Sequence, residues 1–157
     1  MEYRTIGALI ALSLILAGIN AMADETKDVP LPQLPQGAGK VDADAPKSLS
    51  KTSSGLEYRI LRKGTGPKPK ATDTVRVNYH GWFDDKKVFD SSYDAGRPAE
   101  FPLNGVIKGW TEGLQLVGQG GMIELQIPSD LAYGDRGRPG IPPKARLHFL
   151  VELLNVQ

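Results

Sequence analysis

Alternating apolar and polar residues dominate the chain from residue 56 onward, and this pattern limits the folds that it can adopt. In residues 56–60, Leu, Tyr and Ile alternate with Glu and Arg, and the same period of two continues over 75–81. Because successive side chains of a β-strand point to opposite faces, each segment predicts a half-buried strand. Residues 123–127 and 147–153 alternate in the same way. The sequence therefore predicts a sheet of several strands.

Residues 106–116 depart from this period. Ile107, Trp110 and Leu114 recur at helical spacing, and Gly118 is a typical residue to follow the end of a helix. We therefore expect one short helix among the strands. A curved antiparallel sheet wrapped around this helix, an α+β half-barrel, would bury the helix stripe and one sheet face together.

The final strand carries apolar residues on both faces. Leu150 and Leu154 interrupt its alternation. A strand covered on both sides tolerates such residues, so we expect it to lie in the centre of the sheet.

Composition excludes several classes of protein. A chain of 157 residues suits one compact domain. The formal charge of +1, without a dense run of basic residues and aromatics, argues against nucleic-acid binding. Cysteine is absent, which excludes disulfides, thiol nucleophiles and thiolate metal sites.

The N-terminus has the layout of a secretion signal. Arg4 precedes an apolar run over 6–19, which ends at the small-x-small pattern Ala21-Met22-Ala23. The run is shorter than the roughly 20 apolar residues of a membrane-spanning helix. We therefore expect residues 1–23 to be a cleaved signal peptide, and the mature protein to be periplasmic or secreted and without stable membrane insertion.

Residues 24–50 are rich in proline and poor in apolar residues. A segment of this kind buries too little surface to offset its ordering entropy. We interpret it as a flexible linker, locally stiffened by proline, that precedes a catalytic domain over 51–157.

Five short motifs make the function specific. They are VNYHG at 77–81, VFDSS at 88–92, VIKGW at 106–110, LAYG at 131–134, and GIPP at 140–143, followed by LHFLVELL at 147–154. In this order and spacing they resemble the FKBP-type peptidyl-prolyl cis-trans isomerases, and the export signal makes the chain most similar to the bacterial periplasmic and secreted members. The resemblance extends from about residue 53 to the C-terminus and implies an FKBP-like fold.

The resemblance also implies a binding pocket. Its lining residues would be Tyr79, Phe89, Asp90, Phe101, Val106, Ile107, Trp110, Tyr133, Ile141 and Phe149. By the same resemblance, Trp110 forms the floor beneath the substrate proline and Asp90 supplies the acidic group. The backbone N–H of Ile107 binds a carbonyl that follows the proline, and the Tyr133 hydroxyl binds the carbonyl that precedes it.

The partners implied are proline-containing polypeptides, above all unfolded exported proteins, and macrolide inhibitors that mimic a twisted prolyl amide. No cofactor and no metal are implied. The bacterial periplasmic and surface members that the chain resembles often carry an N-terminal helical dimerisation domain. Residues 24–50 supply no such helix, so we expect a monomer.

These residue types suit the reaction. Rotation about an Xaa-Pro bond breaks amide resonance, with a barrier of roughly 20 kcal/mol, and no new covalent bond is needed. A dry aromatic pocket disfavours the charge-separated planar amide relative to the twisted one, which is differential binding of the transition state.

Other interpretations remain open. Taken alone, Trp110 could be a core residue and Asp90 a turn residue. A hydrolase triad lacks its nucleophile motif, and His80 with His148 is a weak metal pair without further ligands. The main alternative is a non-catalytic binding module or chaperone that grips unfolded chains in the same cleft.

Overall fold

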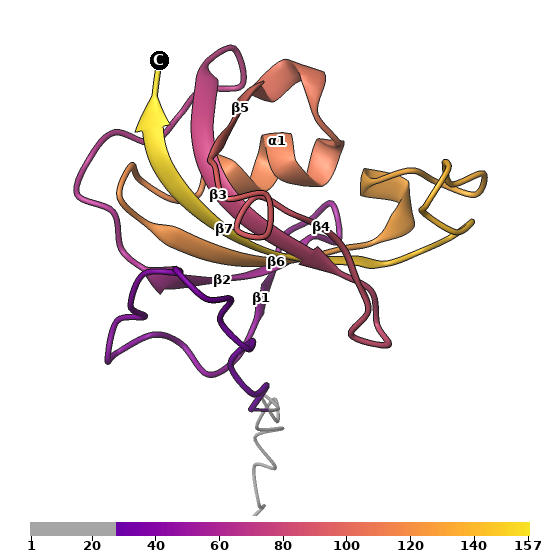
Figure 1. Ribbon diagram of the computed structural model, residues 1–157, viewed down its shortest axis with the longest axis horizontal. Helices are drawn as coiled ribbons and strands as arrows, with labels where there is room; N and C mark the ends of the chain where they lie inside the picture. Colours follow the sequence, from indigo (N-terminus) through magenta and orange to yellow (C-terminus); the bar gives the residue numbers. More distant parts are fainter. Residues whose placement is uncertain (1–27) are drawn as a thin grey trace, which may run out of the picture.

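One antiparallel sheet organises the part of the chain that the computed structural model describes, residues 28–157 (Figure 1). The predicted signal peptide lies outside the described residues. The seven strands are β1 Ser50–Lys51, β2 Glu57–Arg62, β3 Thr74–Trp82, β4 Val88–Ser91, β5 Ala99–Pro102, β6 Met122–Ile127 and β7 Leu147–Val156. Their order is β1-β2-β6-β7-β3-β4, and β5 also pairs with β3. The predicted α+β fold is confirmed, and β7 lies centrally between β6 and β3, as its apolar residues indicated.

The single α-helix of residues 28–157, α1 Lys108–Leu114, lies across the concave face of the sheet (Figure 1). Two 3-10 turns, η1 Leu103–Gly105 and η2 Ser129–Leu131, follow β5 and β6. Glycines let the helix approach β6 closely, because a Cβ atom at Gly109 would overlap Ile127 and one at Gly113 would overlap Leu125. The helix therefore presents its other buried side chains directly to the sheet.

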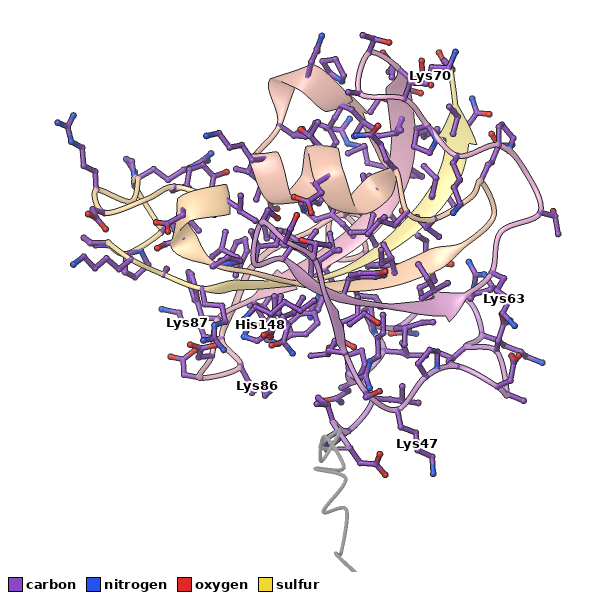
Figure 2. All side chains as sticks on the ribbon, turned by 180° about the vertical axis from the view of Figure 1, so that it is seen from behind. Lys47, Lys63, Lys70, Lys86, Lys87 and His148 are labelled. Carbon is purple, nitrogen blue, oxygen red and sulfur yellow. The ribbon has the colours of Figure 1, made fainter. Side chains whose placement is uncertain are left out.

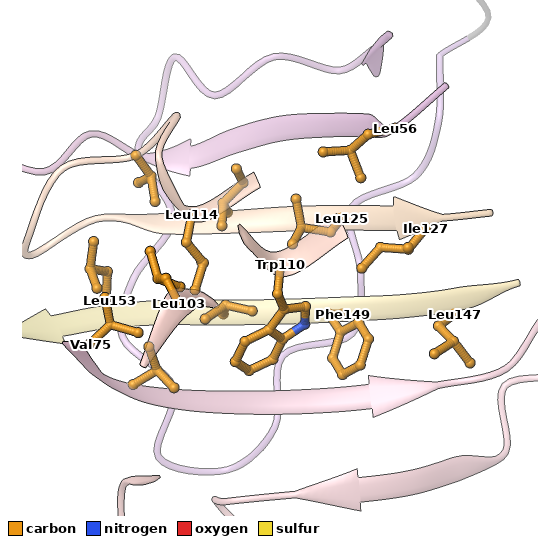
Figure 3. Close-up of a cluster of buried hydrophobic side chains, with 14 of the residues drawn as sticks. Leu56, Val75, Leu103, Trp110, Leu114, Leu125, Ile127, Leu147, Phe149 and Leu153 are labelled. Carbon is orange, nitrogen blue, oxygen red and sulfur yellow. The ribbon is translucent and has the colours of Figure 1, made fainter. Parts of the chain in front are cut away.

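The main core fills the space between α1 and the concave face (Figure 3). Leu114 and Trp110 from the helix meet Leu125, Phe149 and Leu153 from the central strands. All five side chains are buried, as the alternation of the strands and the helical spacing of Trp110 and Leu114 predicted.

A second, smaller core lies on the convex face. It comprises Leu61, Trp82, Met122 and Leu150, and Ala38 and Val41 from the N-terminal segment pack against it. Apolar residues on both sheet faces require cover on both sides, since exposed apolar surface is unfavourable in water. The segment over 28–49, here called the N-terminal strap, provides that cover on the convex side.

Arg59 attaches the strap to the sheet. Its side chain donates hydrogen bonds to three strap carbonyls, those of Val29 at 2.7 Å, Pro30 at 2.6 Å and Lys47 at 3.0 Å. The guanidinium also pairs with Glu124 of β6 at 2.5 Å, and both residues are buried. Burial raises the pKa of Glu124, and the bond from Arg59 partly opposes that rise.

The strap therefore differs from the free linker expected over 24–50. It has no helix or strand of its own before Ser50, in agreement with its composition, yet it is attached to the sheet by the bonds from Arg59 and by one backbone hydrogen bond, from the Asp42 N–H to the Leu61 carbonyl at 2.8 Å. The expectation considered only apolar side chains within the segment, whereas the attachment uses its carbonyl groups and a buried arginine elsewhere. No helix over residues 28–157 has the length and hydrophobicity needed to cross a membrane.

Candidate active-site pocket

A cavity of about 700 Å³ opens beside the N-terminal end of α1 on the concave side of the sheet. All ten residues that the sequence predicted for the pocket line this one cavity. They are Tyr79, Phe89, Asp90, Phe101, Val106, Ile107, Trp110, Tyr133, Ile141 and Phe149. Gly105, Lys108, Ala132, Arg138, Pro139 and Gly140 complete the lining.

Trp110 lines the cavity, is buried and meets three aromatic rings edge to face. Its ring centroid lies 5.4 Å from Tyr79, 5.6 Å from Phe101 and 5.2 Å from Phe149. Figure 3 shows the Trp110 indole beside Phe149 over the central strands. Edge-to-face pairs are a favoured arrangement of aromatic rings, so the rings that line the pocket support one another.

The buried Nε1–H of Trp110 has no hydrogen-bond partner within residues 28–157. An unpaired buried donor is rare in native proteins and costs about 1–3 kcal/mol. A smaller apolar residue would avoid this cost while filling a core.

Asp90 supplies the acidic group, and Tyr79 holds it. The Tyr79 hydroxyl donates to Asp90 Oδ2 at 2.8 Å. Burial and this bond to a carboxylate raise the pKa of Tyr79. The phenol therefore stays protonated and continues to donate across the physiological range.

Two polar donors at the pocket have no acceptor within the described chain. The Ile107 N–H, immediately before α1, donates to no described group. The Ile107 carbonyl, in contrast, accepts from the N–H groups of Trp110 and Thr111. The Tyr133 hydroxyl accepts a bond from Arg138 and donates to no other described group. Both donors are thus available to a ligand that enters the cavity.

The loop between η2 and β7 brings Tyr133, Arg138 and Ile141 to the rim. Arg138 and Ile141 exchange two backbone hydrogen bonds, of 3.0 and 2.8 Å, around the turn Pro139-Gly140. Gly140 has φ +84°, a conformation that this type of turn requires and glycine adopts readily. The turn fixes Ile141 in the pocket wall, where it is buried.

Sequence reasoning assigned Gly81 no part in the site and did not indicate the contact between Arg138 and Tyr133. A Cβ atom at Gly81 would lie 2.7 Å from Phe89 Cζ and 2.8 Å from Phe149 Cε1, so both rings depend on glycine there. The only sequence signal was a glycine at an inward position of an alternating strand. For Arg138, nothing in its loop sequence indicated contact with Tyr133.

The two histidines face away from the pocket. His148 Nε2 bonds Asp84 at 2.6 Å, close to the lysines of the β3–β4 hairpin (Figure 2). Its ring stacks on Trp82, while burial lowers the pKa of His80 nearby. No group of three or more metal-binding side chains occurs over residues 28–157.

Comparison with known proteins places this geometry in one family. The family model described as FKBP-type peptidyl-prolyl cis-trans isomerase matches residues 66–154. The FKBP-type peptidyl-prolyl cis-trans isomerase FkpA of Escherichia coli strain K12 is 52% identical over 111 residues, which are 71% of this chain and 41% of that protein. This chain spans about half the length of the curated relatives it matches.

Solved structures of peptidyl-prolyl cis-trans isomerases also match the fold of this chain. The crystal structure of FkpA from Escherichia coli matches with a TM-score of 0.70 and 52% identity, over 71% of this chain and 53% of that chain. The crystal structure of a peptidyl-prolyl cis-trans isomerase from Pseudomonas syringae pv. tomato matches with a TM-score of 0.65 and 41% identity, over 69% of this chain and 80% of that one.

Proposed function

The chain belongs to the family of FKBP-type peptidyl-prolyl cis-trans isomerases, and from this premise we propose that it accelerates rotation about Xaa-Pro bonds in polypeptides. The observation that carries the proposal is the Trp110 indole, walled by aromatic rings and flanked by two free donors. Such a pocket accepts a proline ring and offers hydrogen bonds to the carbonyl groups on either side of it.

Desolvation of the amide contributes most to lowering the barrier to rotation. A planar amide is more charge-separated than a twisted one, so removal of water disfavours the planar ground state. The pocket needs neither a nucleophile nor a metal, because no covalent bond other than the partial double bond changes. An acceleration of about 10⁴-fold corresponds to only about 5.5 kcal/mol.

Specific residues would then orient the substrate. Trp110 supports the proline ring, the Ile107 N–H binds the carbonyl after the proline, and the Tyr133 hydroxyl binds the carbonyl before it. Asp90 presents its carboxylate to the imide, while Tyr79, Phe89, Phe101, Val106, Ile141 and Phe149 exclude water. Their common placement around one cavity supports these roles.

An isomerisation assay on a short Xaa-Pro peptide tests the proposal, by protease coupling or by NMR exchange. Trp110→Leu should lower kcat/KM by about a hundredfold or more, because it removes the base of the pocket. The chain contains its own matched control, since Trp82 is equally buried but lies on the convex face. Trp82→Leu should reduce stability yet leave turnover per folded molecule near the wild-type value.

The same assay separates an isomerase from a binding module. A chaperone without catalytic activity would suppress aggregation of an unfolded protein but leave the peptide isomerisation rate unchanged. Wild-type protein that binds proline peptides without accelerating their rotation would therefore contradict the proposal.

We also propose that the protein acts on unfolded exported proteins, as a periplasmic or secreted monomer with a signal peptide over 1–23 and a catalytic domain over 51–157. The N-terminal layout supports export. N-terminal sequencing of the natural product should find a chain that starts near Asp24, whereas an intact Met1 would contradict this. A macrolide that mimics a twisted prolyl amide should compete with peptide for the pocket.

A further inference from the structure

Arg138 reaches Tyr133 across the rim of the pocket. Its guanidinium donates to the Tyr133 oxygen at 3.1 Å and lies 5.0 Å from the centre of the Tyr133 ring. The same residue lines the cavity, although its side chain is exposed. Arg138 is therefore both part of the pocket and in direct contact with a proposed substrate-binding hydroxyl.

The backbone fixes this contact from both sides. The Gly137 N–H donates to the Tyr133 carbonyl at 3.2 Å, immediately before Arg138. Beyond it, the two bonds between Arg138 and Ile141 close the turn. A side chain at position 138 is thus directed by a defined loop rather than by a free one.

The hydrogen bond has a consequence for the Tyr133 proton. Arg138 carries only donors, so Tyr133 acts as the acceptor in this pair. The phenolic proton is left to point elsewhere, and no described residue accepts it. A donor to the phenol oxygen also polarises the O–H group, which strengthens the bond that the hydroxyl makes to a substrate carbonyl.

The lining of the cavity carries more basic than acidic side chains. Among the lining residues, Lys108 and Arg138 are basic, whereas Asp90 is acidic and accepts the Tyr79 hydroxyl. In the proposed binding mode, Tyr133 holds the carbonyl that precedes the proline. This carbonyl belongs to the residue before the proline, so the side chain of that residue lies near Tyr133 and near the charge of Arg138.

We propose that Arg138 selects substrates by the charge of the residue before the proline, favouring Glu over Gln and Gln over Lys, while it orients the Tyr133 hydroxyl. This inference rests on the proposed function, since it assumes that the proline occupies the pocket. It ranks acidic residues before proline above neutral polar and basic ones.

Three peptides that differ only in Glu, Gln or Lys before proline test this selectivity. Both kcat/KM in an isomerisation assay and the dissociation constant from NMR titration are measured for each. Exposed charge pairs contribute modestly, so the wild-type should favour Glu over Gln by about two- to fivefold. The preference should weaken at high salt, because the pair is solvent-accessible.

Variants separate charge from positioning. Arg138→Gln should equalise the three peptides. Arg138→Lys should retain part of the charge preference while lowering kcat for all three, since a flexible ammonium replaces the planar fork that holds Tyr133. Arg136→Gln is the matched control, because Arg136 lies in the same loop, is exposed and does not line the cavity. It should keep the wild-type ratios.

The outcomes are distinct. If Arg138→Gln keeps the wild-type preference, or if Arg136→Gln removes it, the inference is wrong. If no peptide is isomerised but the affinities still follow Glu, Gln and Lys through Arg138, the proposed activity fails and the selectivity stands.

Discussion

The Tyr79 hydroxyl donates a 2.8 Å hydrogen bond to Asp90 Oδ2, so a residue of β3 holds the acidic group that β4 brings to the pocket. The Tyr79 ring also packs edge to face against Trp110. One side chain therefore joins the apolar lining of the pocket to its carboxylate. Loss of the hydroxyl should affect orientation of the acid, whereas loss of the ring should affect the pocket itself.

Substitution at this pair should lower activity without loss of the fold. Asp90→Ala should lower kcat/KM by about ten- to a hundredfold, because hydrogen bonds to charged groups are worth roughly 1.5–3 kcal/mol. Tyr79→Phe keeps the ring and should cause a smaller loss, of about fivefold or less. Urea denaturation provides the check on folding. Wild-type kcat/KM in both variants would show that the carboxylate takes no part.

A single methyl group at Gly81 should disturb the pocket. The added Cβ atom would lie 2.7 Å from Phe89 and 2.8 Å from Phe149, closer than carbon atoms approach. Gly81→Ala should therefore displace both rings, destabilise the protein by about 1–3 kcal/mol and reduce kcat/KM. Urea denaturation and the peptide assay measure the two effects. An unchanged rate in a stable variant would mean that the rings are not needed where they lie.

Local pattern sufficed to predict the core on the concave side of the sheet. The alternation in β2, β3, β6 and β7 reports which residues face inward, and the helical spacing of Trp110 and Leu114 reports the stripe that meets them. The ten lining residues were assembled by a resemblance in motif order, because periodicity alone places Phe89 and Phe149 in a core as readily as in a pocket. Close approach of rings to Gly81 depends on three-dimensional packing that a linear pattern does not contain.

The cover of the convex face was harder to predict from the sequence, for a different reason. The strap has few apolar residues, and its composition is typical of an unattached segment. Its attachment depends on Arg59, which reads as a solvent-facing residue in an alternating strand but is 1% exposed. The available signal lay in Leu61, Trp82 and Leu150, whose apolar side chains face away from the helix and need a cover.

Removal of Arg59 should release the strap. Arg59→Met leaves the Glu124 carboxylate buried without its partner, and breaking a buried pair in this way costs about 3–5 kcal/mol. The double variant Arg59→Met with Glu124→Leu should recover much of that loss, since it buries no charge. Urea denaturation measures the stability, and hydrogen exchange over 28–49 measures the attachment. Unchanged exchange in both variants would show that the strap is held by other contacts.

Glu152 links the strap to the loop that follows β4. Its Oε1 accepts from the Gly39 N–H at 3.0 Å and from the Tyr93 hydroxyl at 2.5 Å, and its Oε2 pairs with Arg62 at 2.5 Å. Burial alone would raise the pKa of Glu152, but these three donors together hold it below the usual value of 4.5. Glu152 is therefore ionised in the folded protein at neutral pH.

The contribution of Glu152 to stability should depend on pH. Between its lowered folded pKa and the unfolded value of 4.5, the unfolded chain binds more protons than the folded one, so the free energy of unfolding rises with pH. The contribution is complete above that window and is lost as pH falls through the folded pKa. Glu152→Gln should therefore be less stable than wild-type by about 1–3 kcal/mol near neutral pH, and the difference should shrink at about pH 3. Urea denaturation at both pH values measures this, with Glu57→Gln, which breaks only a surface pair to Lys51, as a control that changes stability little. A difference that stays constant down to the acid limit would show that the Glu152 charge does not hold the strap and the Tyr93 loop together.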